Sequence, residues 1–103
     1  MNPNLVIDAI EKLILTAKDR DVLDRWQDYA TVRVLAEELH EWAKTREQTP
    51  GAAVREKILD LMRRMAGLAG FTEGEGFDFD WYVNQALVGV QGLRFYFRDA
   101  KES

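Results

Sequence analysis

Apolar residues recur every three or four positions over most of the first 70 residues, and this spacing constrains the fold more than any other feature. Because a helix turns by about 100° per residue, residues at this spacing line one side of it. Three segments show the pattern, over residues 3–18, 22–46 and 50–69. Each such helix has one apolar side to bury, so the spacing predicts helices that pack against one another.

The expected helix starts carry side chains that accept hydrogen bonds from free backbone N–H groups. Asn2-Pro3 and Thr49-Pro50 each place a capping residue before a proline, which fits a first turn because it has no N–H to satisfy. Asp19-Arg20-Asp21 offers a turn and a new cap, with a bent continuous helix as the alternative because no glycine or proline is present. The expected apolar sides hold Leu5, Val6, Ile10, Leu13, Ile14 and Ala17, then Val32, Leu35, Ala36, Leu39, Trp42 and Ala43, then Val54, Ile58, Leu61, Met62, Met65, Leu68 and Ala69.

The last third of the chain fits two secondary structures. Read as strands, residues 77–83 and 93–98 alternate apolar and polar side chains, as in a β-hairpin. Read as a helix, the segment carries a ridge of small residues at Ala86, Gly89 and Gly92, on which another helix can pack closely. We favour the helix because the sequence NQALVGVQG lacks a two-residue hairpin turn.

The predicted fold is mainly α, a small four-helix bundle that forms a single domain over residues 1–103. The alternative is an α+β fold in which the C-terminal third is a hairpin. A content of 47% hydrophobic and 31% charged residues is ordinary for a folded domain of this length.

Composition also excludes several classes of site and location. The chain has no cysteine, so disulfides and zinc–thiolate sites are excluded and a reducing compartment fits. The first residues, MNPNLVIDAIEK, lack a basic region, and Asp8 interrupts their apolar run, so no signal peptide is expected. No apolar run approaches the roughly 18–20 residues of a membrane span. A net charge of −4 disfavours direct binding to nucleic acid or to an anionic membrane. We expect a cytoplasmic protein without a cofactor.

The second predicted helix sets three carboxylates beside the only histidine, His40. Its residues 25–31 and 35–41, RWQDYAT and LAEELHE, resemble the E-E-x-x-E helix of MazG-like nucleotide pyrophosphohydrolases. The resemblance implies an all-α enzyme that hydrolyses nucleoside triphosphates with Mg²⁺. The metal ligands that it implies are Glu37, Glu38, Glu41 and Asp60.

Helical geometry favours a different role for these acids. By steps of about 100°, the three glutamates lie opposite the apolar side of their helix. Glu56 and Asp60 lie opposite the apolar side of the third helix, one residue further apart than the E-x-x-D motif of that family. Helices joined through their apolar sides would point both acidic sets into solvent and away from each other. The expected ion pairs are Glu37 with Arg33, Glu41 with Lys44, and Asp60 with Arg63 or Arg64.

Residues 71–97 combine an acidic stretch with most of the aromatic side chains. Residues 71–84 carry a charge of −4, and eight of the eleven aromatic residues lie between 71 and 97. Since Phe95, Tyr96 and Phe97 are consecutive, they cannot all point inward, and an exposed aromatic surface rimmed by charge is typical of protein interfaces. The predicted partner-binding residues are Glu73, Glu75, Phe77, Asp78, Phe79, Asp80, Trp81 and Tyr96.

The sequence therefore predicts a non-catalytic protein-binding module, such as an inhibitor, an immunity protein, an anti-defence factor or a regulatory adaptor. Its partner would be another protein or a second copy of the chain in a homodimer. Because the acidic stretch imitates phosphate charge, a nucleic-acid-binding protein is one expected partner. The Mg²⁺-dependent pyrophosphohydrolase is the alternative.

Overall fold

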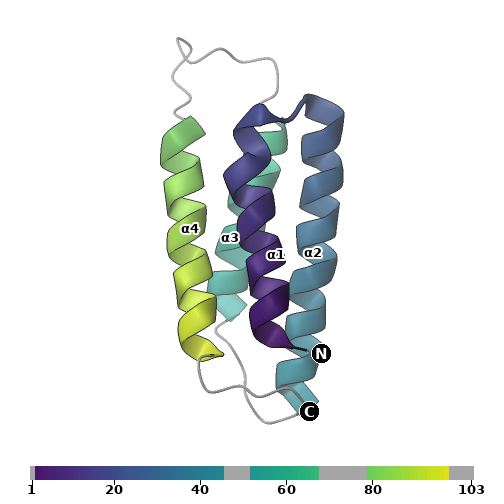
Figure 1. Cartoon of the computed structure of the whole chain (residues 1–103), viewed down its shortest axis with the longest axis vertical. Coiled ribbons are helices and arrows are strands. Elements are labelled where there is room, and N and C mark those ends of the chain that lie inside the picture. The colour runs from purple at the N-terminus through teal and green to yellow at the C-terminus, as the bar shows by residue number, and fades with distance from the viewer. Residues whose placement is uncertain (1, 46–51, 68–78, 98–103) are drawn as a thin grey trace.

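The computed structural model describes residues 2–45, 52–67 and 79–97. The elements are α1 (Pro3–Thr16), the 3₁₀ helix η1 (Ala17–Asp19), α2 (Val22–Thr45), α3 (Ala52–Gly67) and α4 (Phe79–Tyr96). Figure 1 shows the four α-helices side by side, with successive helices running in opposite directions. The main contacts join α1 to α2 and α4, and α3 to α2 and α4. The predicted four-helix arrangement is confirmed for the described residues, and none of their helices is long and apolar enough to cross a membrane.

The first two helix starts are capped as the sequence predicts. Oδ1 of Asn2 accepts a hydrogen bond from the N–H of Asn4 at 3.0 Å, and Pro3 occupies the first turn of α1. Oδ1 of Asp21 accepts a hydrogen bond from the N–H of Asp24 at 2.9 Å. The chain therefore breaks between α1 and α2 rather than continuing as a bent helix. The predicted cap at Thr49-Pro50 lies outside the described residues.

Arginine side chains hold the turn between α1 and α2 in place of a glycine or proline. Nε and one terminal nitrogen of Arg20 donate to the two carboxylate oxygens of Asp28, at 3.0 and 3.3 Å. Asp28 is only 6% exposed, and its hydrogen bond raises the pKa of Arg20. Nε of Arg25 donates to the carbonyl oxygen of Ala17 at 2.9 Å, which also accepts the backbone N–H of Arg20 at 3.2 Å, so Arg25 ties the start of α2 to η1.

The buried side of α1 differs from the expected one. Ile7, Ile10 and Ile14 are fully buried, whereas Leu5 is 65% exposed. The placement of Leu5 on the buried side is wrong, because it lies about 180° around the helix from Ile14. The hydrophobic core comprises Ile7, Ile10, Ile14, Ala17, Val32, Leu39, Trp42, Ile58, Leu59, Leu61, Met62, Phe79, Ala86, Val90, Leu93 and Phe97.

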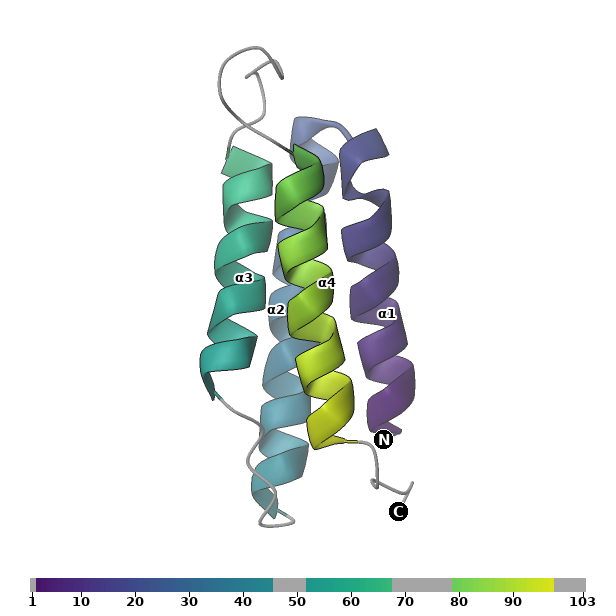
Figure 2. The same cartoon turned by 90° about the vertical axis from the view of Figure 1, so that its left-hand side faces the viewer.

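Residues 79–96 form a helix, so the hairpin alternative is wrong for this segment. The ridge of small residues lets α4 approach α3 closely, since Ala86 is fully buried and Gly89 packs against Ile58. A Cβ atom at Gly89 would lie 2.7 Å from Cγ1 of Ile58, closer than van der Waals contact allows. Figure 2 shows α4 in front, between α3 and α1. This close approach determines which side of α4 faces outward.

Candidate functional site

The structure describes four of the eight predicted partner-binding residues. Phe79, Asp80, Trp81 and Tyr96 belong to α4, although the side chain of Tyr96 lies outside the described part. The other four, Glu73, Glu75, Phe77 and Asp78, lie outside the described residues. The candidate surface is therefore built from α4.

Phe79 belongs to the core rather than to the predicted surface. Its side chain is 7% exposed. The guanidinium carbon of Arg25 lies 4.7 Å from the centre of the Phe79 ring, a cation–π contact that ties the start of α4 to α2. The inclusion of Phe79 among the partner-binding residues is therefore wrong, because the phase of α4 turns this side chain inward.

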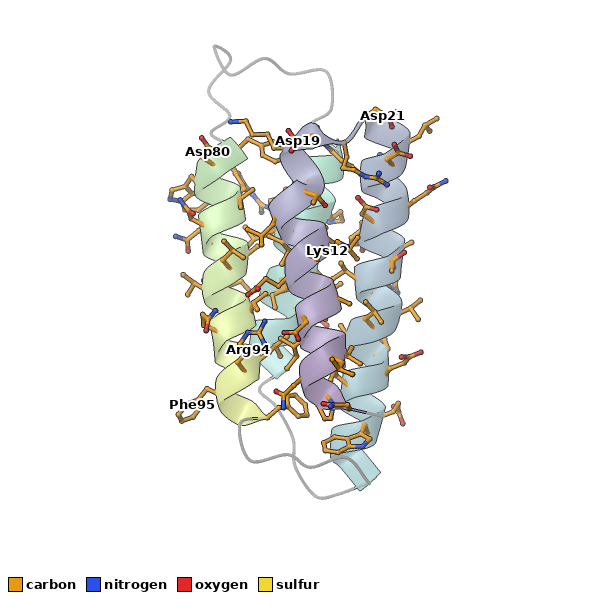
Figure 3. The ribbon with its side chains drawn as sticks, viewed as in Figure 1. Lys12, Asp19, Asp21, Asp80, Arg94 and Phe95 are labelled. Carbon is orange, nitrogen blue, oxygen red and sulfur yellow. The ribbon has the colours of Figure 1, made fainter. Side chains whose placement is uncertain are left out.

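Asp80 is exposed but lies against a positive charge. Nζ of Lys18 in η1 lies 3.1 Å from Oδ1 of Asp80, with 47% and 72% of the two side chains exposed. Figure 3 shows Asp80 at the first turn of α4. Lys18 therefore offsets the charge of the one predicted acid that the structure describes.

Trp81, Val88 and Phe95 are exposed apolar side chains in one row along α4. They are 50%, 58% and 62% exposed. Because they are seven residues apart, about two helical turns each, they share one side of the helix, with Asn84 and Gln91 beside them. We call these five residues the outer strip. Figure 3 shows the side chain of Phe95 projecting away from the bundle.

No residue of the outer strip is charged at neutral pH. The charged residues of α4 are Asp80 and Arg94, and both pair with residues of the α1–η1 segment. One terminal nitrogen of Arg94 lies 2.8 Å from Oδ1 of Asp8 and 3.2 Å from Oε2 of Glu11. Partial burial lowers the pKa of Arg94, but its hydrogen bonds to Asp8 and Glu11 outweigh this effect and raise the pKa overall. The outer strip is thus a neutral band along α4.

Three of the four acids of the metal-site alternative, Glu37, Glu38 and Glu41, are exposed on α2, and the fourth, Asp60, is half-buried on α3. Glu38 and Glu41 line an open hollow together with Val34 and Trp42. Oε1 of Glu37 lies 3.5 Å from a terminal nitrogen of Arg55 in α3. Among the described side chains, no three of His, Asp or Glu lie close enough together to hold a metal ion.

The predicted ion pairs are partly confirmed. Asp60 accepts hydrogen bonds from Arg63 at 3.1 Å and from Arg64 at 2.9 Å, as expected. Among the described ion pairs, Glu37 joins Arg55 instead of the expected Arg33. The side chain of Lys44, the expected partner of Glu41, lies outside the described part.

The acids of α2 and α3 do not all point away from each other, so that expectation is wrong. Glu37, Glu56 and Asp60 line one polar groove of about 250 Å³ between the two helices. Long side chains near the boundary of the apolar side can reach across to the neighbouring helix. Counting about 100° per residue places each residue around its own helix and does not take this reach into account. Arg33 and Arg63 line the same groove, and the hydrogen bond from Arg63 lowers the pKa of Asp60. The groove therefore alternates acids with bases.

Val88 and Phe95 are surface residues that the sequence-based site omits. Their signal is the seven-residue spacing from Trp81 through Val88 to Phe95. The alternation of apolar and polar residues near both ends of the segment fits a strand as well as a helix, and this ambiguity hides the longer spacing.

Comparisons with known proteins found no family model, no curated protein and no solved structure that matches this chain.

Proposed function

We propose that this protein is a non-catalytic protein-binding module that contacts its partner through the outer strip of α4. The observation that carries the proposal is the row formed by Trp81, Val88 and Phe95, each at least half exposed, on a side of α4 without charge. Exposed apolar patches with aromatic residues at their centre are typical of protein interfaces. The role that we propose is that of an inhibitor, an immunity protein, an anti-defence factor or a regulatory adaptor.

The exposed rings supply a useful but modest driving force. Trp81 and Phe95 together expose roughly 250 Å² of aromatic surface, which at about 25 cal/mol per Å² gives roughly 6 kcal/mol before the costs of association. That amount supports a reversible contact, as a regulatory module requires. The cysteine-free composition fits a reducing compartment, and we place this function in the cytoplasm.

Two valines give a matched test of this surface. Val88 on α4 and Val34 on α2 are each 58% exposed, so an aspartate at either position disturbs the core equally little. Val88→Asp should reduce capture of a partner from an extract of the native host by at least about tenfold, because it places a charge at the centre of the contact. Val34→Asp should capture as much as the wild type. Equal capture by the wild type and Val88→Asp would refute the proposal.

A partner that itself binds nucleic acid remains a prediction, since most of the acidic stretch lies outside the described residues. Such a partner would present a basic surface, and its binding should weaken steeply between about 50 and 200 mM salt. Affinity that does not change with salt would remove this class of partner.

The groove between α2 and α3 supports a second candidate function. The argument for the Mg²⁺-dependent pyrophosphohydrolase is that Glu37, Glu56 and Asp60 line one groove, although no three of the described acids lie close enough together to hold a metal ion. The argument is the weaker of the two, since Asp60 and Glu37 are both paired with arginines. We expect no pyrophosphate release from deoxynucleoside triphosphates with Mg²⁺. Release that Glu37→Gln abolishes would establish the enzyme at this groove instead.

A further inference from the structure

The outer strip has a repeating arrangement that identifies a particular partner. We infer that it binds the outer strip of a second copy of this chain, with the two α4 helices antiparallel and the twofold axis at Val88. This inference rests on the proposed function, because it names the partner of the same surface.

The positions of the strip residues are symmetric about Val88. Trp81 precedes it by seven residues and Phe95 follows it by seven. In an antiparallel pair centred on Val88, Trp81 of each copy therefore lies against Phe95 of the other. Asn84 and Gln91 lie on one edge of the strip, and the same symmetry brings Asn84 of one copy beside Gln91 of the other. The two amide side chains both donate and accept hydrogen bonds, so each pair satisfies itself.

Side-chain size favours the antiparallel arrangement over the parallel one. Gly92 lies at the border between the small ridge and the strip, about 40° around α4 from Val88 and one turn before Phe95, and its missing side chain leaves room at that edge of the strip. The antiparallel pair brings Trp81, the largest side chain of the strip, to the end of the second helix that holds Gly92. A parallel pair would set Trp81 against Trp81 and Gly92 against Gly92, with crowding at one end and a gap at the other. Antiparallel helices also align their dipoles favourably.

Charge explains why the two copies would meet at this strip. Each copy has a net charge of −4, so most approaches between two copies bring like charges together. The charged residues of α4 are already paired with α1 and η1, Asp80 with Lys18 and Arg94 with Asp8 and Glu11. Among the described residues, the neutral strip is therefore a surface on which a second copy meets little repulsion. One helix per copy gives a contact at the small end of protein interfaces, and we expect a dissociation constant in the roughly micromolar range.

Two measurements on the full chain test the dimer. Sedimentation equilibrium from about 1 to 500 µM should show a monomer–dimer equilibrium. Val88→Asp should raise the dissociation constant at least about tenfold, and Val34→Asp should leave it unchanged. Far-ultraviolet circular dichroism checks that both variants keep their helices.

Because the chain has no cysteine, single cysteine variants report the orientation directly. With a short bismaleimide crosslinker, Val88→Cys should form dimers with itself. Trp81→Cys and Phe95→Cys should each give little product alone and a mixed dimer when combined, while Val34→Cys stays at background. Efficient dimers from Trp81→Cys alone and from Phe95→Cys alone would overturn the antiparallel arrangement.

The same experiments separate this inference from the proposed function. A wild type that stays monomeric, together with a Val88→Cys variant that gives no more crosslinked product than Val34→Cys, overturns the second copy as partner. If Val88→Asp still loses capture of a different protein, the proposed function stands. If capture is also insensitive to Val88→Asp, both fail together.

Discussion

Replacing Gly89 with alanine perturbs the close approach of α4 to α3. Two effects oppose each other. Alanine stabilises a helix interior by about 1 kcal/mol relative to glycine. Its Cβ, however, would lie 2.7 Å from Cγ1 and 3.2 Å from Cδ1 of Ile58, which is 2% exposed and cannot move into solvent. A β-branched side chain is stiff near the backbone, so overpacking at this site should cost about 1–3 kcal/mol.

The overlap therefore outweighs the gain in helix propensity. Gly89→Ala should destabilise the protein by roughly 1 kcal/mol, which lowers the melting temperature of a domain of this size by about 4–8 °C. In an Ile58→Ala background both interfering carbon atoms are gone. The same substitution should then stabilise the protein by up to about 1 kcal/mol, so that its sign reverses.

The four proteins to compare are the wild type, Gly89→Ala, Ile58→Ala and the double variant. Urea unfolding followed by circular dichroism gives the free energy of unfolding of each, and from these the coupling energy between the two positions. Ile58→Ala itself should lower the free energy of unfolding by about 2–5 kcal/mol, because it leaves a cavity. The double variant is therefore compared with Ile58→Ala and not with the wild type. If Gly89→Ala stabilises the protein when Ile58 is intact, or if its effect is the same in both backgrounds, the packing of α4 on α3 is not as described.

Three further predictions concern caps and ion pairs. Asn2→Ala should destabilise the protein by about 1 kcal/mol in urea unfolding, because the N–H of Asn4 loses its acceptor; an unchanged midpoint would contradict the cap. Arg20→Ala should lower the melting temperature more than Lys12→Ala on the exposed side of α1, because it leaves the buried carboxylate of Asp28 without its guanidinium. Asp60→Asn should lower the melting temperature at pH 7, and the difference should shrink as the pH falls below 3.8. Hydrogen bonds from arginine lower the pKa of Asp60 below its ordinary 3.8, so its contribution is present above 3.8 and lost as pH falls through the lowered value. A difference that persists undiminished at pH 2 would contradict this reasoning.

The local features of this fold can be read from the sequence. Asn2 and Asp21 mark the first two helix starts because capping depends on residues only two or three positions apart. The apolar spacing of α2 locates Val32, Leu39 and Trp42 in the core, because the period of a helix is fixed by its backbone. The small ridge of α4 likewise indicates where another helix can approach.

The surface of α4 was decided only by the tertiary structure. Phe79 and Phe95 are chemically identical, yet one is 7% exposed and the other 62%. Burial of apolar side chains has no preferred direction, so composition does not say which aromatic faces the core. In the packed structure α4 is rotated so that Gly89 lies against Ile58, Phe79 points inward and Phe95 points outward.

Long-range ion pairs depend on the same packing. Lys18 meets Asp80, 62 residues further along the chain, and Glu37 meets Arg55 across the α2–α3 junction. Spacing along one helix predicts the partners of Asp60 because Arg63 and Arg64 lie on the same helix. It does not predict pairs between helices, since these require the relative height and rotation of both, which only the packed core determines.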